Sequence, residues 1–327
     1  MALRPPRFWS LSPGESTAAK LLAPLGVLYH CEVQRRLKAR SPLKPGAPVI
    51  CVGNVTMGGV GKTPFVRMLG ERLLSRGIAV HILTRGYGGT EQGPLRVSQD
   101  SPADEVGDEP LMLASSLPVW ISKDRAKGAE AAVAAGAELL IMDDGFQNPS
   151  IAKDLSFLLV DAETLFANGA VFPAGPLREK PQTAWSRCDA VAAMLPSADH
   201  PVPEELKAFS RGKPLLAAWF DLDSDTVPDA PLLAFCGIGH PERFFHSLQR
   251  SGADLIDQVA FPDHHVFTEA DLQPLHRDAA RLGAQLVTTE KDACRLSLEQ
   301  RQDIAVARGS MRVRNETALY DVLKDIL

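Results

Sequence analysis

Short apolar runs alternate along most of the chain with segments of helical periodicity. The apolar runs predict six strands, at Val49–Val52, Ile78–Leu83, Val119–Ser122, Leu139–Met142, Leu155–Val160 and Ala190–Met194. Helical patterns lie between them, at Thr63–Ser75, Glu109–Ser116 and Arg125–Ala135. This alternation predicts βαβ units and a mainly parallel sheet flanked by helices, which is an α/β fold.

Residues 221–231 interrupt this pattern. The segment DLDSDTVPDAP is rich in Asp and Pro, and we interpret it as a linker. Strand and helix signals restart after it, at Leu232–Cys236, Pro241–Ser251, Asp271–Leu282 and Gln285–Thr288. We therefore predict three parts, namely an N-terminal arm (residues 1–44), a core (45–227) and a second, smaller α/β lobe (228–327).

The N-terminal arm has the pattern of an amphipathic helix that begins at Pro24, a residue well suited to the first position of a helix. Leu25, Tyr29, Val33 and Leu37 recur at i, i+4 spacing and predict one apolar face. The cationic side chains near its end are Arg35, Arg36, Lys38 and Arg40. Such a helix can lie in a membrane interface, with its bases attracted to anionic lipid, or it can pack its apolar face on the protein body.

Charge is distributed unevenly over the 327 residues. The whole chain carries a net charge of −5, which argues against a nucleic-acid partner. Residues 1–44 hold eight bases and two acids, a local net charge of +6, which leaves −11 on the rest. A basic arm on an acidic body indicates contact with something anionic at one end. The longest apolar run of the arm, Leu21–Tyr29, is far shorter than the ~20 residues of a membrane-spanning helix.

The strongest signal for chemistry is a glycine-rich loop after the first predicted strand. The loop reads Thr56-Met57-Gly58-Gly59-Val60-Gly61-Lys62-Thr63 and opens a predicted helix. A strand, loop and helix of this kind form a phosphate-binding P-loop, because glycines let backbone N–H groups approach phosphates at a helix N-terminus. We expect Lys62 to reach the β- and γ-phosphates of ATP and the Thr63 hydroxyl to bind Mg²⁺. The predicted fold is therefore P-loop NTPase-like.

The loop departs from the motif G-x-x-x-x-G-K-[ST], because Thr56 stands where the first glycine is expected. It is similar to the deviant P-loops of partitioning and division-site ATPases, although those carry Lys where this chain has Met57. An alternative function is therefore a deviant P-loop ATPase that acts as a membrane-bound positional or assembly switch. Met57 and the lack of a C-terminal membrane helix disfavour this alternative. A nucleotide sensor that only binds is a third possibility.

Carboxylates adjoin two of the predicted elements. Asp143 and Asp144 end the strand at Leu139–Met142, where P-loop proteins place an Asp that holds Mg²⁺; a turn or a helix cap is the alternative. Asp108 precedes a predicted helix and is a candidate to orient an acceptor alcohol and take its proton. An N-cap role explains Asp108 equally well.

Further polar motifs are ambiguous by themselves. The segment Phe261-Pro262-Asp263-His264-His265 can ligate a metal, face a substrate or be structural. Arg178 and Glu179 follow Gly175-Pro176-Leu177 without a defined role. The residues at 288–292 follow a predicted strand, at the position where α/β sheets place ligand-binding loops.

Together these motifs resemble the tetraacyldisaccharide 4′-kinase family, the lipid A 4′-kinases. In the family's order they are Val52-Gly53-Asn54 with Gly58-Gly59-x-Gly61-Lys62-Thr63-Pro64, Arg85-Gly86-Tyr87, Gly107-Asp108-Glu109-Pro110, Asp143-Asp144-Gly145-Phe146-Gln147, Pro173-Ala174-Gly175-x-Leu177-Arg178-Glu179, Phe261-Pro262-Asp263-His264 and Thr288-Thr289-x-Lys291-Asp292. Two departures are Asn148, where the family usually has His, and Lys180, which is inserted before Pro181.

The resemblance implies a peripheral enzyme on the cytoplasmic face of the inner membrane of Gram-negative bacteria. It would transfer the γ-phosphate of ATP to the 4′-hydroxyl of an acylated glucosamine disaccharide 1-phosphate, a lipid substrate, giving lipid IVA and ADP. Asp108 would be the base, tuned by His264. The residues implied for ATP are 56–63 (Thr56, Met57, Gly58, Gly59, Val60, Gly61, Lys62, Thr63) with Arg178, and those implied for Mg²⁺ are Thr63, Asp143, Asp144 and Glu179. A lipid acceptor favours a membrane role for the N-terminal arm, and we expect the two lobes to close on nucleotide.

Overall fold

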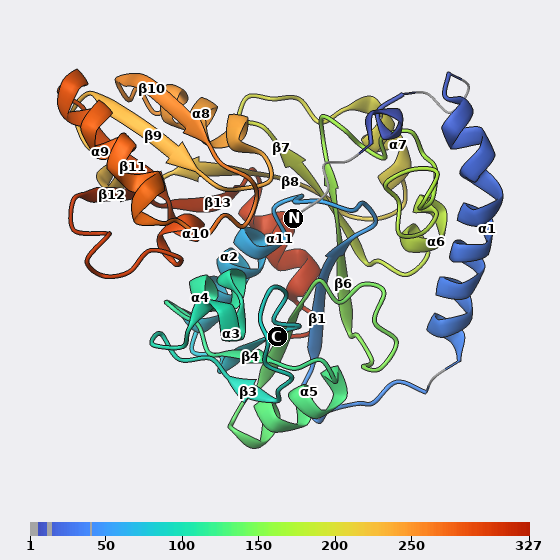
Figure 1. Ribbon diagram of the computed structural model, residues 1–327. Helices are drawn as coiled ribbons and strands as arrows, with labels where there is room; N and C mark the ends of the chain where they lie inside the picture. Colours follow the sequence, from blue (N-terminus) through green and yellow to red (C-terminus); the bar gives the residue numbers. More distant parts are fainter. Residues whose placement is uncertain (1–5, 12–14, 40) are drawn as a thin grey trace.

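The computed structural model describes residues 6–11, 15–39 and 41–327 (Figure 1). Arg40, one of the basic residues of the predicted arm, lies outside these ranges. The chain forms a large α/β core and a smaller α/β lobe, with one long helix at the edge of the core (Figure 1).

The core is built on a nine-stranded sheet with the order β13-β8-β7-β6-β1-β5-β2-β4-β3. Its strands are β1 (Val49–Asn54), β2 (Val80–Thr84), β3 (Leu95–Arg96), β4 (Val119–Ile121), β5 (Leu139–Asp143), β6 (Leu155–Asp161), β7 (Ala190–Leu195), β8 (Leu215–Leu222) and β13 (Gly309–Val313). All neighbours pair in parallel except the two edge strands β3 and β13, which are antiparallel. The predicted, mainly parallel sheet is confirmed.

Helices cover both faces of this sheet. They are α2 (Lys62–Leu74), α3 (Ala103–Val106), α4 (Asp108–Leu113), α5 (Arg125–Ala134), α6 (Pro181–Trp185), α7 (Glu204–Ser210) and α11 (Glu316–Leu323). Ile50 of β1 packs in one core with Phe65 of α2, whereas its neighbour Cys51 packs in the other core with Ala129 of α5. Successive side chains of a strand point to opposite faces, so the uninterrupted apolar runs of the sequence serve two cores at once.

The smaller lobe has its own four-stranded parallel sheet, in the order β10-β9-β11-β12. Its elements are η2 (Ser224–Thr226), β9 (Leu232–Cys236), α8 (Pro241–Arg250), β10 (Leu255–Ala260), α9 (Glu269–Leu282), β11 (Gln285–Thr289), α10 (Glu290–Ala293) and β12 (Ile304–Ala307). Apolar residues of α8 and of α9 belong to separate cores, one on each face of this sheet.

After β12 the chain returns to the large sheet. The small lobe therefore does not include all of residues 228–327, contrary to the prediction from the sequence. β13 pairs with β8, and α11 packs beside it. The burial of apolar side chains explains this return, because the core that contains residues of β1 and α2 also contains Met311, Val313, Leu319 and Leu323. Because the polypeptide crosses between the two parts twice, two connections join the small lobe to the core.

The N-terminal arm forms η1 (Arg7–Trp9) and the long helix α1 (Thr17–Lys38). Ser16 caps the start of α1 by accepting a hydrogen bond from Ala19 N, so the expectation that the helix begins at Pro24 is wrong and this proline lies inside it. Gly26 allows the close approach of α1 to the core, because a Cβ there would lie 2.7 Å from the carbonyl oxygen of Val171. Within the described residues, no helix is both long and apolar enough to cross a membrane.

Candidate active site

A cleft of about 1700 Å³ lies where the P-loop, the carboxyl end of β5 and the small lobe meet. Lys62, Thr63, Asp143, Asp144 and His264 are among the residues that line it. The carboxyl ends of parallel strands meet at one edge of a sheet, which is where ligands bind in open α/β folds. The cleft therefore gathers residues such as Lys62 and His264, which are about two hundred positions apart in the sequence.

The predicted P-loop has the backbone that phosphate binding requires. β1 ends at Asn54, and α2 begins at Lys62 with Gly61 as its N-cap. Gly58 and Gly61 have φ angles of 123° and 85°, a region that side chains with a Cβ avoid. The glycines therefore turn the loop so that the N-terminus of α2, with its free N–H groups, faces the cleft.

Two cations flank one carboxylate beside this loop. Lys62 Nζ donates to Asn54 Oδ1 at 3.2 Å and lies 3.7 Å from Asp144 Oδ1. Arg178 donates to both oxygens of Asp144, at 2.8 and 3.0 Å. Burial alone would raise the pKa of Asp144, but Lys62 and Arg178 outweigh it and the net shift is downward. Lys62, Asp144 and Arg178, which were predicted separately, therefore form one charged group at the phosphate loop.

Asp143 lies in a different environment from its neighbour. The Thr63 hydroxyl is 3.3 Å from Asp143 Oδ2 and 3.2 Å from Glu109 Oε2, so it can donate to either carboxylate. Asp143 is only 3% exposed, and burial, followed by the charge of Glu109, raises its pKa to about 7. Its Oδ1 is buried without a hydrogen-bond partner among the described residues. A buried carboxylate oxygen with a free lone pair is suited to a hard cation.

The described part of the chain contains no group of three His, Cys, Asp or Glu side chains placed to hold a metal ion. This finding is compatible with Mg²⁺, which is usually held by one or two carboxylates together with waters and the phosphates of its nucleotide. Asp143 and the Thr63 hydroxyl supply donors of that kind. The other candidate ligands are occupied: Asp144 by Arg178, and Glu179 by Arg187.

Glu179 is not brought together with Thr63 and Asp143. Its fully buried carboxylate accepts hydrogen bonds of 2.6 Å from Arg187 on both oxygens, and a third of 3.1 Å from Gln147. Two more come from Gln34 of α1, at 3.3 Å, and from the Thr183 hydroxyl, at 3.1 Å. These contacts give Glu179 a structural role between α1 and the core, and its role as a metal ligand stays a prediction.

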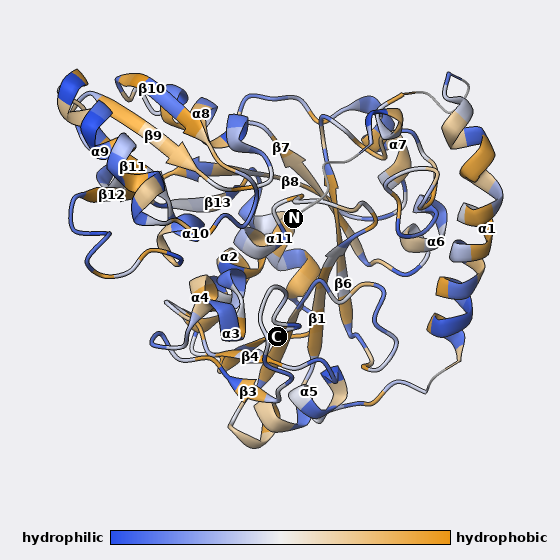
Figure 2. Cartoon of the chain, viewed as in Figure 1, coloured by the Kyte–Doolittle hydropathy of each residue, from blue (hydrophilic) through white to orange (hydrophobic). Residues whose placement is uncertain are grey.

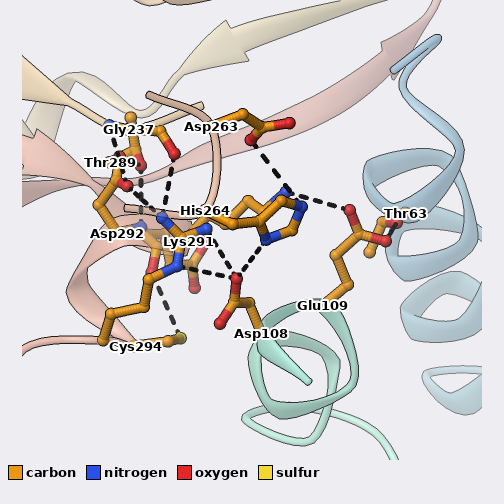
Figure 3. A network of polar contacts seen from close by, with 12 residues as sticks. Thr63, Asp108, Glu109, Gly237, Asp263, His264, Thr289, Lys291, Asp292 and Cys294 are labelled. Carbon is orange, nitrogen blue, oxygen red and sulfur yellow. Dashed lines mark hydrogen bonds and ion pairs between the residues drawn. The ribbon is translucent and has the colours of Figure 1, made fainter. Parts of the chain in front are cut away.

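Asp108 contacts His264, a residue of the small lobe that lines the cleft. His264 Nδ1 lies 2.9 Å from Asp108 Oδ2, and the two side chains point toward one another (Figure 3). Asp108 is the first residue of α4, while Gly107 occupies the N-cap position with a φ angle of 94°. Asp108 therefore does not act as the N-cap. Burial opposes ionisation, but hydrogen bonds from His264 and Arg295 prevail and lower the pKa of Asp108 to about 2.

Several side chains at the site were not among the predicted site residues, although Lys291 lies in the motif at residues 288–292. Arg295 donates to Asp108 at 2.8 Å from the small lobe, and Lys291 of the same lobe donates to Glu109 at 3.3 Å. Arg67 of α2 pairs with Glu290, at 2.7 Å, in a third ion pair between the two parts. Only the i, i+3 spacing of Asp292 and Arg295 hinted at an ion pair, since these positions are adjacent on a helical turn.

A phosphate loop, an acidic strand end and a histidine that contacts Asp108 meet at one cleft and define a P-loop phosphotransferase. The model of the family described as "Tetraacyldisaccharide-1-P 4'-kinase" matches residues 18–327. The tetraacyldisaccharide 4′-kinase of Parvibaculum lavamentivorans is 48% identical over 90% of this chain and 87% of its own. That of Jannaschia sp. is 46% identical over 99% of both chains. The chain belongs to the tetraacyldisaccharide 4′-kinase family.

The fold is also similar to a solved relative. A crystal structure of LpxK from Aquifex aeolicus in complex with ATP has a TM-score of 0.74 and 28% sequence identity, over 94% of this chain and 99% of that chain. The P-loop fold and the kinase class expected from the sequence are therefore confirmed. The alternative, a deviant P-loop ATPase that acts as a positional switch, is not favoured by these matches.

Proposed function

We propose that this kinase transfers the γ-phosphoryl group of ATP to the 4′-hydroxyl of a tetraacylated glucosamine disaccharide 1-phosphate, using Asp108 as the residue that receives the acceptor alcohol. The single observation that carries this proposal is the Asp108–His264 contact of 2.9 Å, because His264 lines the cleft that also contains Lys62 and the P-loop. A carboxylate held by an imidazole is able to orient an alcohol and take its proton.

The donor side of the reaction is assigned to the loop at residues 56–63 and to Arg178. Backbone N–H groups of the loop would bind the phosphates, and Lys62 and Arg178 would move from Asp144 toward their charge. Mg²⁺ would be held by Thr63 and Asp143, and when bound it would neutralise charge on the β- and γ-phosphate oxygens. Asp144, 3.7 Å from Lys62, would position that lysine.

The acceptor side is assigned to Asp108 and His264. The sugar oxygen forms a bond to the γ-phosphorus while the bond from that phosphorus to the β,γ-bridging oxygen breaks and ADP leaves. The hydroxyl proton passes to Asp108, or through it to His264, and then to water. With a pKa of about 2, Asp108 is ionised at neutral pH and ready to accept the hydrogen bond of the alcohol.

We assign to α1 the contact with the membrane that contains the lipid substrate. Leu21, Leu25 and Leu28 are 75%, 51% and 66% exposed, and they lie on one face because their spacing is i, i+4, i+7. Figure 2 shows apolar residues along most of α1 and polar residues near its end, where Arg35, Arg36 and Lys38 lie. By contrast, Tyr29 packs toward the core.

This helix would bind the enzyme peripherally to the cytoplasmic face of the bacterial inner membrane, where the acyl chains of the substrate are located. An exposed apolar face next to basic residues is suited to the interface of an anionic membrane. The apolar face that meets lipid is the leucine face, rather than the face expected from Leu25, Tyr29, Val33 and Leu37.

The proposal is tested by incubating the purified protein with ATP, Mg²⁺ and the acylated disaccharide 1-phosphate, followed by mass spectrometry of the lipid. We expect the lipid to gain one phosphoryl group, at the 4′ position. A lipid that stays unchanged while the protein hydrolyses ATP would contradict the proposal. Asp108→Asn, which keeps the size of the side chain, should bind ATP normally and fail to phosphorylate the lipid.

A further inference from the structure

Arg295 connects the small lobe to the carboxylate of Asp108. Its Nε donates to Asp108 Oδ2 at 2.8 Å, and its Nη2 lies 2.7 Å from the same oxygen. The side chain of Arg295 is only 5% exposed, and that of Asp108 is 11% exposed. A buried arginine that follows α10 therefore contacts the residue to which we assign the acceptor alcohol.

The other end of the Arg295 guanidinium is also fixed. Its Nη1 donates to Asp292 Oδ1 at 2.9 Å and to the carbonyl oxygen of Gly237 at 3.0 Å. Asp292 is fully buried and itself accepts hydrogen bonds from Gly237 N and the Thr289 hydroxyl. Because the guanidinium is planar and held on both sides, its orientation toward Asp108 is set by the small lobe.

The same carbonyl also holds His264. The backbone N–H of His264 donates to the carbonyl oxygen of Gly237 at 3.1 Å, so this one oxygen accepts from both Arg295 and His264. His264 has a φ angle of 59°, which is unusual for a residue with a side chain and places its ring beside Asp108. Arg295 is thus linked to both members of the Asp–His pair.

All three nitrogen contacts of Asp108 converge on Oδ2, as Figure 3 shows for His264. No hydrogen bond from a described residue reaches Oδ1. A carboxylate oxygen without a partner is able to accept a bond from a substrate hydroxyl. Oδ2 of Asp108 is therefore held by His264 and Arg295, whereas Oδ1 is available to the acceptor alcohol.

We propose that Arg295 is a positioning residue for phosphoryl transfer, which keeps Asp108 a carboxylate with Oδ1 free for the acceptor alcohol and holds His264 through Gly237. This inference rests on the proposed role of Asp108. Arg295 does not touch the reacting atoms and acts through the two residues that do.

Electrostatics supports the geometry. The charged groups that act on Asp108 are His264 and Arg295, both from the small lobe. Glu109, its neighbour on α4, is paired with Lys291. Burial raises the pKa of Asp108, whereas His264 and Arg295 lower it. Without Arg295 the burial would be opposed by His264 alone, so the pKa of Asp108 should rise and its ionised fraction at mildly acid pH should fall.

The test compares the pH profiles of kcat for the wild type, Arg295→Met, Arg295→Lys and Arg67→Met. Arg67→Met is the matched control, because Arg67 forms another partly buried ion pair between the two parts, with Glu290. We expect Arg295→Met to lower kcat about 10- to 100-fold, with the KM for ATP within about twofold, and to move the acid limb upward by about one pH unit or more. Arg67→Met should leave the position of the acid limb unchanged.

Arg295→Lys keeps the positive charge but cannot contact Asp108 and Asp292 at the same time as a planar guanidinium does. We therefore expect the acid limb of its pH profile to stay at the wild-type pH, while kcat falls several-fold. Arg295→Met with wild-type kcat and acid limb, or Arg295→Lys with wild-type kcat, would overturn the proposal. A similar shift of the acid limb in Arg67→Met would also overturn it, because general weakening of the contact between lobes would then explain the effect. If Asp108→Asn keeps full kcat, the proposed role of Asp108 fails instead.

Thermal unfolding of each variant shows whether it is folded. If Arg295→Met does not fold, the result for Arg295→Lys decides the test.

Discussion

Gln34 of α1 donates a hydrogen bond of 3.3 Å to Glu179, a fully buried carboxylate that follows the cleft residue Arg178 in the chain. Glu179 also accepts from Gln147, whose amide nitrogen donates at 2.9 Å to the carbonyl oxygen of Asn54, at the end of β1. An unbroken set of polar contacts therefore joins the helix with the exposed leucines to the strand that leads into the P-loop.

Glu179→Gln should destabilise the protein without changing its requirement for Mg²⁺. The substitution leaves Arg187 without its ion-pair partner, so the free energy of unfolding should fall by about 1–3 kcal/mol. The Mg²⁺ concentration that gives half-maximal activity should stay within about twofold, because metal affinity depends on ligands that this side chain does not supply. Chemical denaturation and a Mg²⁺ titration of activity measure the two effects.

The original expectation for Glu179 predicts the opposite pattern. If its carboxylate binds the metal during turnover, Glu179→Gln should raise the half-maximal Mg²⁺ concentration by about tenfold or more. That result with unchanged stability would contradict the structural role of Glu179. Asp143→Asn serves as the comparison, since Asp143 has the unpartnered buried oxygen.

Asp143→Asn should stabilise the nucleotide-free protein while abolishing turnover. Burial and Glu109 raise the pKa of Asp143 to about 7, so folding disfavours its ionised form. For an acid whose folded pKa is raised, this penalty is absent below the unfolded pKa of about 4 and grows until the pH passes about 7. We expect Asp143→Asn to raise the free energy of unfolding by roughly 2–4 kcal/mol at pH 8, and by less at pH 5.

Denaturation curves of the wild type and Asp143→Asn at both pH values check this prediction, with EDTA present to exclude bound metal. A variant that is less stable than the wild type at pH 8 would contradict it. Asp144→Asn is the control with the opposite sign, because Lys62 and Arg178 lower the pKa of Asp144. Its loss should not stabilise the protein at either pH.

Lys62→Ala should impair both nucleotide binding and turnover. Lys62 is the cation of the P-loop, and its amino group lies 3.2 Å from Asn54 Oδ1, beside the loop. Loss of one charge that stabilises the transferring phosphoryl group commonly costs about 10²–10³-fold in kcat. ATP titration by calorimetry and steady-state kinetics measure the two effects. Unchanged ATP affinity together with unchanged kcat would refute the assignment of the loop.

Leu25→Glu should weaken binding to vesicles without affecting the fold. Leu25 is 51% exposed on α1, so the free protein tolerates a charge there. In the membrane-bound state the change removes the burial of one leucine, roughly 1.5–3 kcal/mol, which corresponds to about a tenfold or larger loss of vesicle binding. Sedimentation with vesicles that contain anionic phospholipid measures it.

Leu298→Glu is the matched control, because Leu298 is 84% exposed in the small lobe, outside the proposed membrane-binding helix. It should sediment with vesicles as the wild type does. Equal vesicle binding by Leu25→Glu and the wild type would contradict the role of α1.

The sheet and the P-loop could be predicted because their signals are local. The run Leu139–Met142 is apolar at every position, and the glycines before Lys62 specify one loop geometry. By contrast, β8 and β13 were missed as strands. Most positions of β8, at the edge of the parallel strands, are only partly buried, and β13 pairs with it from about ninety residues away. Pairing over such a distance leaves no local signal.

The site was only partly predictable for the same reason. Asp108 was a candidate on chemical grounds, His264 was assigned a role only through the family resemblance, and the distance between them became known only from the fold. Arg295 follows the 288–292 motif and has no unusual neighbours in the sequence, yet it contacts Asp108. Pro24 misled the prediction of α1, because a proline that is typical of a helix start lies inside a helix capped by Ser16.

The most direct test of the central claim measures phosphate transfer and nucleotide binding in the same preparations. Wild-type protein and Asp108→Asn are each given ATP labelled in its γ-phosphoryl group, Mg²⁺ and the acylated disaccharide 1-phosphate in detergent micelles. We expect the wild type to move the label to the lipid, and Asp108→Asn to bind ATP with the same affinity but to leave the lipid unlabelled. Label that appears only as free phosphate with the wild type, or equal lipid labelling by the two proteins, would contradict the account.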